Sequence, residues 1–247
     1  MTIEAVVLAR NEESNLRDCL RSLLWTDALT VFDDGSEDDT VAVALELGAR
    51  VVRRRLRDFA DQRNAALEGA TGDWVFFVDA DERSTPALAD EVRSLLGRPE
   101  AGWWVPRDNY IFGKLTRYAG WYPDYQLRLL RRGAARYDPS RPVHETVLLD
   151  GLAGHLTNAL VHYNYRSVRQ FFAKQRRYAR LEAQALSDQG VRAKPHSLIL
   201  QPMREFRRRF LTLGGYRMGG HGLLLSLLLA YYTFLAYAHL LRAQSRS

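Results

Sequence analysis

Cysteine is nearly absent from this sequence, in which Cys19 is the only cysteine among 247 residues. A single cysteine excludes an internal disulfide and a metal site built from cysteine pairs. Cys19 has helical spacing with neighbouring leucines, so it is expected in the core of a helix. The start of the chain also lacks the basic leader and long apolar run of a signal peptide. These absences favour a reducing, cytosolic location for the active domain.

Two glycine-rich phosphate-binding signatures are missing as well. No GxGxxG follows the first apolar run at residues 3–9, and no GxxxxGK[ST] occurs in the chain. These absences argue against a dinucleotide cofactor and against a P-loop.

Charged side chains are missing from residues 222–241, "GLLLSLLLAYYTFLAYAHLL". At about 1.5 Å per residue, a helix of this length could just cross a hydrocarbon core of roughly 30 Å. Three interpretations remain open: a core-packing or oligomerising helix, a helix that lies in the membrane interface, and a true span. The flanking arginine clusters and the internal tyrosines favour the interfacial helix.

The charge that is present is predominantly basic. The formal net charge is +6, and basic runs occur at residues 50–57, 166–180 and 204–209. Such a balance suits phosphates, nucleic acid or an anionic membrane surface. A hydrophobic content of 47% and a charged content of 26% are those of an ordinary folded protein.

The first hundred residues alternate strand and helix patterns. Apolar runs predict strands at residues 3–9, 28–33, 49–54 and 73–79, and helical spacing predicts a helix after each strand. Ser36 and Asp39 have the spacing of a capping box for the second helix. This order predicts an α/β fold with a mostly parallel central sheet and helices on both faces.

After about residue 100 the pattern becomes irregular and aromatic, and after residue 166 it becomes helical and basic. The sequence therefore predicts three segments. Residues 1–100 form an α/β half of nucleotide-binding type, residues 101–165 form an irregular second half of the same domain, and residues 166–247 form a basic and apolar helical tail.

Polar groups gather at the carboxyl ends of the four expected strands. These ends carry residues 9–12, 33–34, 53–55 and 79–82, and ligands of open α/β sheets bind at this edge. Carboxylates separated by one residue, as in Asp79-Ala80-Asp81, suit Mg²⁺ or Mn²⁺ that also binds substrate phosphates. Nearby arginines could neutralise the remaining phosphate charge. The sequence thus predicts a site for a metal–diphosphate.

Four stretches in order carry a family resemblance: "VVLARNEESNLRDCLRSL", "VFDDGSEDDT", "QRNAALEGATGDWVFFVDADE" and "GWYPDYQLRLLRR…PVHE". Together they resemble the family-two inverting glycosyltransferases of GT-A fold, over roughly residues 3–240. Within that superfamily the chain is most similar to the bacterial branch of lipopolysaccharide core β-glucosyltransferases. The basic stretch "RRRLRDF" departs from the family, which often has glycine near residues 58–59.

The resemblance implies a nucleotide pocket. Residues 9–12 would edge it, with Glu12 near the base or ribose. One of the two acids at 33–34 would contact the nucleobase, commonly uracil, and residues 62–64 would close over the diphosphate. The nucleotide-binding residues implied are Ala9, Arg10, Glu12, Asp33, Asp34, Gln62, Arg63, Asn64 and Asp79.

The resemblance also assigns the acidic DXD motif to a metal. Asp81 would coordinate Mg²⁺ or Mn²⁺ directly, and Asp79 would bind the ribose or a metal-bound water. Because these acids serve the leaving group, the base that deprotonates the acceptor must come from the second half of the chain. Glu145 is the favoured base and Asp124 the runner-up, while His144 would orient the acceptor or contact the diphosphate. The alternative for Glu145 is a surface residue paired with Arg141.

Acceptor-side residues are implied by the stretch "QLRLL", which resembles the QxxRW-type motif of processive synthases but lacks its tryptophan. Gln126 and Arg128 are therefore assigned to acceptor binding without processivity. Trp121 and Tyr122 could stack on an acceptor sugar or equally belong to the core. The other histidines, including His162, lack the spacing of metal ligands and are expected to be ordinary.

The leading hypothesis is a metal-dependent inverting glycosyltransferase that uses a nucleotide sugar, with UDP as the expected nucleotide, and a glycan or lipid-linked acceptor of the cell envelope. It is expected to be cytoplasmic, peripheral to or anchored in the inner face of the membrane and in contact with anionic lipid. Nucleic acid is not expected as a partner, and the oligomeric state stays open. The alternatives are a nucleotidyltransferase and a non-catalytic basic module that binds membrane or nucleic acid.

Overall fold

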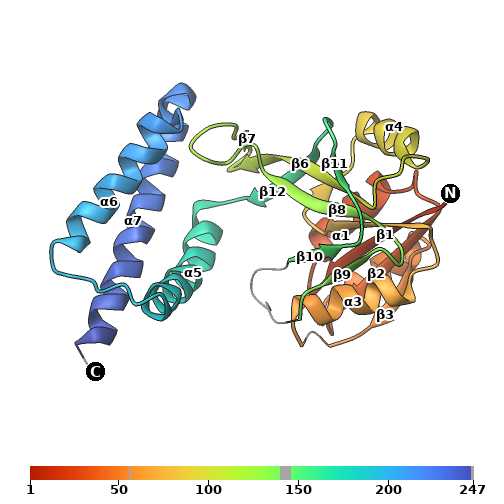
Figure 1. Ribbon diagram of the computed structural model, residues 1–247, viewed down its shortest axis with the longest axis horizontal. Coiled ribbons are helices and arrows are strands. Elements are labelled where there is room, and N and C mark those ends of the chain that lie inside the picture. The colour runs from red at the N-terminus through yellow and green to blue at the C-terminus, as the bar shows by residue number, and fades with distance from the viewer. Residues whose placement is uncertain (56, 140–145, 246–247) are drawn as a thin grey trace. The chain divides into compact units, whose positions relative to one another are not determined.

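The computed structural model describes residues 1–55, 57–139 and 146–245, which belong to two compact units (Figure 1). The first unit comprises Met1–Asp108 and Asp124–His162, and the second comprises Asn109–Pro123 and Tyr163–Ser247. Each unit has its own apolar core.

Four parallel strands form the N-terminal part of the sheet in the first unit. They are β1 (Ile3–Ala9), β2 (Ala28–Asp33), β3 (Arg50–Arg53) and β4 (Trp74–Asp79), in the order β3-β2-β1-β4. The register places Leu8 opposite Asp79 and Ala9 opposite Asp33, so the carboxyl ends of these strands are level. The predicted α/β architecture and the four predicted strands are confirmed.

Helices cover both faces of this sheet because buried side chains alternate along the strands. Residues such as Ala5 and Val7 share one core cluster with side chains of α1 (Glu13–Ser22), α2 (Thr40–Glu46) and α4 (Pro86–Leu95). Val6 and the opposite-facing residues share a second cluster with α3 (Phe59–Gly69). Cys19 is buried in the first cluster, as predicted.

The capping box predicted for the second helix does not form. Asp39 occupies the N-cap position of α2, but its side chain makes no capping hydrogen bond. The Ser36 hydroxyl instead accepts a hydrogen bond from the backbone N–H of Asn11, 2.9 Å away. This long-range contact joins the loops that follow β1 and β2 and replaces the local cap.

Later strands extend the sheet mainly in antiparallel fashion. β8 (Tyr125–Arg131) pairs with β4, and β6 (Gly102–Ile111) pairs with β8. The path continues through β12 (Leu160–Tyr165) to β5 (Glu82–Arg83). The short strands are β7 (Lys114–Leu115), β9 (Ala135–Tyr137), β10 (Val147–Leu149) and β11 (Ala153–His155). The parallel sheet foreseen from the sequence is thus the N-terminal half of a mixed sheet.

The second unit is mainly helical. It contains α5 (Val168–Asp188), α6 (Ser197–Arg207), a π-helical turn (Arg208–Thr212), a 3₁₀ turn (Gly215–Met218) and α7 (Gly219–Gln244). The helical segment Gly215–Gln244 contains an 18-residue window with a mean hydropathy of 1.7, so it is long and apolar enough to cross a membrane, and 44% of that window is buried in the protein. A Cβ on Gly222 would lie 1.9 Å from the carbonyl oxygen of Gly215, so the start of α7 packs closely on the preceding turn.

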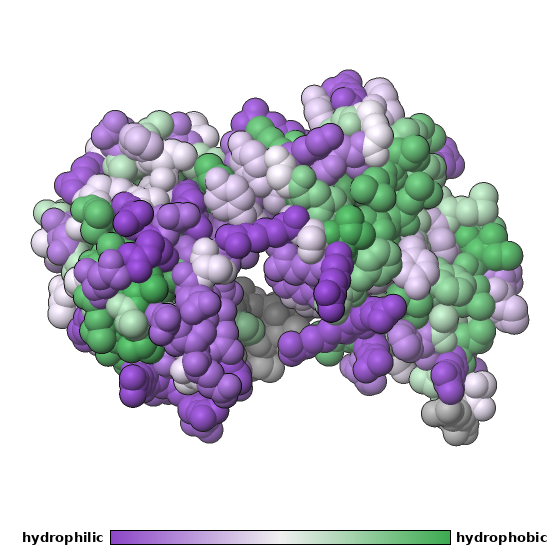
Figure 2. Space-filling model, turned by 180° about the vertical axis from the view of Figure 1, so that it is seen from behind, coloured by the Kyte–Doolittle hydropathy of each residue, from purple (hydrophilic) through white to green (hydrophobic). Residues whose placement is uncertain are grey.

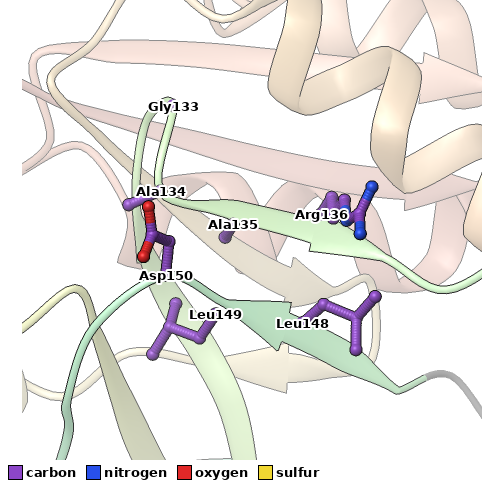
Figure 3. A pocket seen from close by; sticks show the side chains of 7 residues that line it. All are labelled: Gly133, Ala134, Ala135, Arg136, Leu148, Leu149 and Asp150. Carbon is purple, nitrogen blue, oxygen red and sulfur yellow. The ribbon is translucent and has the colours of Figure 1, made fainter.

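An open hollow of about 360 Å³ lies beside the β9–β10 pair (Figure 3). Residues Gly133–Arg136 and Leu148–Asp150 line it. None of the site residues expected from the sequence lines this hollow, and the candidate site lies elsewhere in the first unit.

Candidate active site

Parallel strands bring the predicted acids to one edge of the sheet. Both carboxylate oxygens of Asp33 accept hydrogen bonds from the backbone N–H of Ser36, and one also accepts from Gly35. Asp33 therefore stabilises the turn that carries Asp34. Asp34 in turn forms an ion pair with Arg10, whose nitrogen lies 3.2 Å away and whose side chain is mostly exposed.

Asp79, at the end of β4, lies between two buried arginines. The guanidinium of Arg128 contacts both of its carboxylate oxygens, with Nη1 3.1 Å from Oδ1, and Arg63 Nη2 lies 3.4 Å from Oδ1. Burial alone would raise the pKa of Asp79, but the two guanidiniums outweigh it and hold the pKa well below its usual range. Asp79 is therefore an ion-pair partner of two arginines that favour its ionised form.

Glu82 is fully buried, contacts Arg128 as well and joins one more arginine, Arg107, to this cluster. Its Oε2 accepts a hydrogen bond of 2.9 Å from the backbone N–H of Asp79. Its Oε1 lies 3.3 Å from Arg107 Nη1 and 3.5 Å from Arg128 Nη2. Glu82 thus orients the backbone of the acidic motif and the arginines around it. The third acid after the strand therefore has a structural role.

Arg107 extends the cluster to the runner-up catalytic base. Its Nε and Nη2 donate hydrogen bonds of 3.0 Å to the two oxygens of Asp124, and Gln126 donates to the same carboxylate. Burial alone would lower the pKa of Arg107, but Glu82 and Asp124 raise it. The ion pairs form an alternating chain of arginines and carboxylates. In order, this ion-pair chain is Arg63, Asp79, Arg128, Glu82, Arg107 and Asp124.

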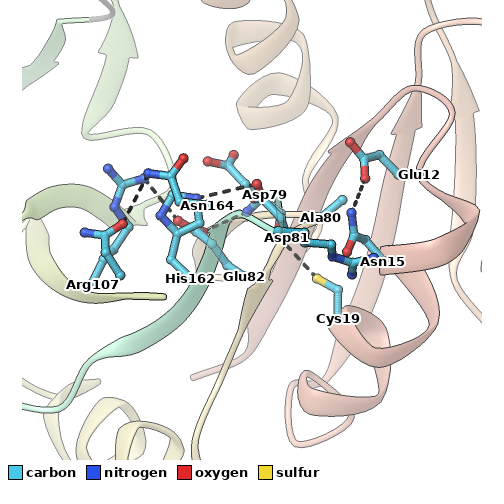
Figure 4. Close-up of polar contacts among 12 residues, drawn as sticks. Glu12, Asn15, Cys19, Asp79, Ala80, Asp81, Glu82, Arg107, His162 and Asn164 are labelled. Carbon is cyan, nitrogen blue, oxygen red and sulfur yellow. Dashed lines mark hydrogen bonds and ion pairs between the residues drawn. The ribbon is translucent and has the colours of Figure 1, made fainter. Parts of the chain in front are cut away.

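Asp81 lies outside the ion-pair chain and faces a histidine. Its Oδ2 is 3.5 Å from Nε2 of His162, which β12 carries opposite Glu82 in the β12–β5 pair (Figure 4). The Asp81 side chain is 28% exposed, whereas that of His162 is 9% exposed. The two acids of the DXD motif therefore have different surroundings, arginines for Asp79 and an imidazole for Asp81.

The three predicted residues of α3 have different environments. Arg63 contacts Asp79, and its guanidinium also stacks over the rings of Phe77 and Tyr137. Gln62 is buried and donates to the carbonyl oxygen of Arg54. Asn64 exchanges two hydrogen bonds with the backbone of Tyr137, which attaches β9 to the helix.

The remaining predicted residues are divided between the two units. Gln126 and Arg128 belong to the first unit and contact acids of the ion-pair chain. Trp121 is partly buried against the core of the second unit, and Tyr122 is 42% exposed beside Arg117. His144 and Glu145 lie outside the described residues.

Sequence reasoning missed Glu82, Arg107 and His162. Glu82 was visible as a third acid, but its role needs the arginines that β6 and β8 supply. Arg107 and His162 are single residues within strands, and only the pairing of distant strands brings them to the acidic motif. No local spacing could have identified them.

The residues present can be tested against the divalent cation expected from the sequence. No group of three or more histidine, cysteine or acidic side chains that could hold a metal occurs among the described residues. Asp81 with His162 nonetheless offers one carboxylate and one imidazole, and Mg²⁺ and Mn²⁺ are held by few protein ligands when substrate phosphates and water complete their shell. The donor set fits a cation that arrives with a diphosphate.

Comparison with known proteins gives one family. The family model "Glycosyl transferase family 2" matches residues 4–143. The chain is 32% identical to the lipopolysaccharide core biosynthesis glycosyltransferase LpsC of Rhizobium meliloti, across 96% of this chain and 91% of that protein. It is 25% identical to an uncharacterized glycosyltransferase, RC0292, of Rickettsia conorii, across 99% and 92%.

Two solved structures are also similar. Residues 1–349 of Staphylococcus aureus TarS give a TM-score of 0.49 at 14% identity, covering all of this chain and 92% of that one. Glucosyl-3-phosphoglycerate synthase of Mycobacterium tuberculosis, solved with Mn²⁺, UDP and glucosyl-3-phosphoglycerate, gives 0.47 at 22% identity, covering 78% and 81%. From the family match and the extent of the sequence identity, the chain belongs to glycosyl transferase family 2 and is a glycosyltransferase of GT-A fold.

Proposed function

We propose that this glycosyltransferase moves a sugar from a UDP-linked donor to a glycan or lipid-linked acceptor of the cell envelope, with inversion and with a divalent cation. The observation that carries the proposal is the split acidic motif. Arginines contact Asp79, whereas Asp81 faces His162 and solvent. Such a split leaves one acid open to a cation beside a rigid, charge-balanced cluster of arginines and carboxylates.

Asp81 and His162 would hold the cation. When bound, the cation supplies positive charge that stabilises the departing nucleoside diphosphate. The remaining work falls to the protein's own side chains. Arg63 and Arg128 are buried and oriented by Asp79 before any donor binds, so the field near the diphosphate needs little reorganisation.

The nucleoside would bind at the ends of β1 and β2. Arg10 and Asp34 form an ion pair there, on a turn that Asp33 stabilises. An arginine beside a carboxylate offers both donors and acceptors, which is what a pyrimidine edge requires. Glu12 occupies the N-cap position of α1 in the same region, and its carboxylate accepts a hydrogen bond from the Asn15 side chain.

The environment of Asp124 supports Glu145 as the catalytic base. Both oxygens of Asp124 accept hydrogen bonds from Arg107, so its carboxylate is already engaged by a guanidinium. A base for single displacement must take the proton of the acceptor hydroxyl at neutral pH. We therefore assign proton abstraction to Glu145 and a positioning role to Asp124, with His144 beside the acceptor.

The acceptor class follows from the relative rather than from the site. LpsC of Rhizobium meliloti is described as a lipopolysaccharide core biosynthesis glycosyltransferase, and the chain is similar to it over nearly its whole length. We propose an acceptor of the same kind, made at the cytoplasmic face of the membrane, with Gln126 as the candidate acceptor contact of the first unit.

A screen of nucleotide sugars tests the proposal. The purified chain should hydrolyse one UDP-sugar slowly in the presence of Mn²⁺, and a chelator should stop the reaction. NMR of the product formed with an acceptor should show inversion at the anomeric carbon. Release of inorganic diphosphate from nucleoside triphosphates instead would support a nucleotidyltransferase, and retention of configuration would contradict the inverting mechanism.

A further inference from the structure

The positive charge of this protein is concentrated in its C-terminal part. Residues 189–247 contain nine lysines and arginines but one acid, Glu205, whereas the rest of the chain contains 26 basic and 28 acidic residues. The whole excess of positive charge therefore belongs to the segment that forms α6, the turns after it and α7.

One side of α7 carries an exposed apolar stripe. Its members are exposed at i, i+1, i+4, i+8 and i+11, which places them along one face of a helix. We use the term apolar stripe for Leu223, Leu224, Leu227, Tyr231 and Phe234, whose exposures range from 37% to 52%. The other side of α7 packs in the core of the second unit through residues such as Leu225, Tyr232 and Ala236.

The neighbouring helix α6 exposes apolar and basic side chains together. Ile199 and Met203 are more than 60% exposed, and Leu200 is 46% exposed. Arg204 and Arg207 are exposed on the same helix. Glu205, the one acid of this region, is already bound by Arg208 and Arg209. Figure 2 shows hydrophobic residues gathered over this part of the molecule, with hydrophilic ones among them.

From this arrangement we infer that α6 and the apolar stripe of α7 bind an anionic lipid surface and lie in its plane. Exposed apolar side chains would enter the headgroup region, while Arg204 and Arg207 would contact lipid phosphates. Because the one acid of α6, Glu205, is already paired with Arg208 and Arg209, the surface has charge complementarity to an anionic leaflet. This inference deepens the proposed membrane location, but it does not depend on glycosyl transfer.

An in-plane helix fits α7 better than a span. A lone helix that spans a membrane is surrounded by lipid on every side. One side of α7 instead packs against α5 and α6. α6 cannot accompany α7 across a bilayer, because Arg204 and Arg207 would enter hydrocarbon. The surface therefore resembles an interfacial anchor, in which one face is apolar and its border is basic.

Co-sedimentation of the full chain with lipid vesicles tests the inference. Vesicles of equal parts phosphatidylcholine and phosphatidylglycerol should bind the chain, and pure phosphatidylcholine should bind it more weakly. Leu227→Glu should lower the affinity by about tenfold or more, since it places a charge in the stripe. The double variant Arg204→Gln, Arg207→Gln should lose about fivefold per arginine on anionic vesicles.

A matched control separates a surface effect from misfolding. Leu45→Glu changes an equally exposed leucine of the first unit (60%, compared with 52% for Leu227) and should leave vesicle binding unchanged. Circular dichroism should show the same fold in every variant, and donor hydrolysis in detergent-free solution should persist in Leu227→Glu. If Leu227→Glu loses vesicle binding but keeps donor hydrolysis, the lipid-binding surface is supported independently of the proposed reaction.

Three results would overturn the inference. Equal vesicle binding by Leu227→Glu and by the parent chain would exclude the apolar stripe as a lipid-binding surface. Retention in the vesicle pellet after a high-salt wash, regardless of either substitution, would indicate a span. A dimer in the absence of lipid that Leu227→Glu dissociates, with vesicle binding intact, would show that a second copy covers the stripe.

Discussion

The guanidinium of Arg128 contacts both carboxylate oxygens of Asp79, so that the first acid of the DXD motif is committed to an arginine. Arg128 is 7% exposed and Asp79 is 34% exposed, measured on their side chains. Burial alone would lower the pKa of Arg128. The carboxylates of Asp79 and Glu82 outweigh burial and raise the pKa above its usual value. The pair is a fixed element of the site, and under the proposed function Asp81 is the acid that would bind the cation.

Arg128→Met should destabilise the first unit. The change leaves Asp79 with Arg63 alone, and we expect the free energy of unfolding to fall by about 2 kcal/mol, less than for a fully buried pair because Asp79 is partly exposed. Chemical denaturation measures the change. Arg136→Met, on an exposed arginine of β9, is the control and should stay within about 0.5 kcal/mol of the parent. Equal stability of the two variants would contradict the role of the pair.

Glu82→Gln should be more disruptive than its small change in shape suggests. Glutamine can still accept the hydrogen bond from Asp79, but it cannot balance the charge of Arg107 and Arg128. We expect a loss of about 3 kcal/mol in the free energy of unfolding, because breaking a buried ion pair leaves uncompensated charge. The control is Glu46→Gln, which breaks an exposed ion pair with Arg17 and should cost less than about 1 kcal/mol.

The choice of catalytic base predicts opposite behaviour for two carboxylates. Glu145→Gln should bind Mn²⁺·UDP like the parent but lose transfer by about 100-fold or more, the usual contribution of a general base. Asp124→Asn should lose stability and retain part of the transfer rate, since Arg107 holds its carboxylate. Calorimetry with Mn²⁺·UDP and single-turnover transfer separate the two. Full turnover by Glu145→Gln would return the role to Asp124.

Glu4 predicts a pH-dependent stability far from the active site. Burial alone would raise its pKa, but hydrogen bonds from Thr30, Thr71 and Gly72 outweigh it and lower the pKa below the usual value. A lowered pKa stabilises the folded state above the usual glutamate pKa of about 4.3, and this stabilisation is lost as the pH falls through the lower folded value. Glu4→Gln should therefore cost about 2 kcal/mol at pH 7 and progressively less in acid. A gap that does not shrink below about pH 4 would contradict this explanation.

The N-terminal half of the fold could be predicted because local patterns determine it. The run "WVFFVD" is apolar on both faces, and β4 is indeed buried between helices on both sides. The acids at its end were correctly placed at the edge where β1 and β2 also end. The antiparallel strands β6, β8 and β12 could not be placed, because their pairing depends on contacts between distant parts of the chain.

The same distance explains what was missed in the site. His162 lies 81 positions after Asp81 in sequence, and only the β12–β5 pairing joins them. Arg128 was assigned to the acceptor from a motif, and its position beside Asp79 became visible only with β8 next to β4. The length and composition of α7 could be predicted, but which side of it stays exposed depends on α5 and α6.

The division of the acidic motif is tested most directly by calorimetry of Mn²⁺ and UDP binding to the parent chain, Asp81→Asn and His162→Gln. The parent should bind UDP more tightly with Mn²⁺ than without it. Asp81→Asn should abolish this gain, and His162→Gln should weaken it, with UDP binding in chelator and the thermal midpoint unchanged for both. If Asp81→Asn retained the full Mn²⁺-dependent affinity for UDP, the assignment of the metal to this acid would be wrong.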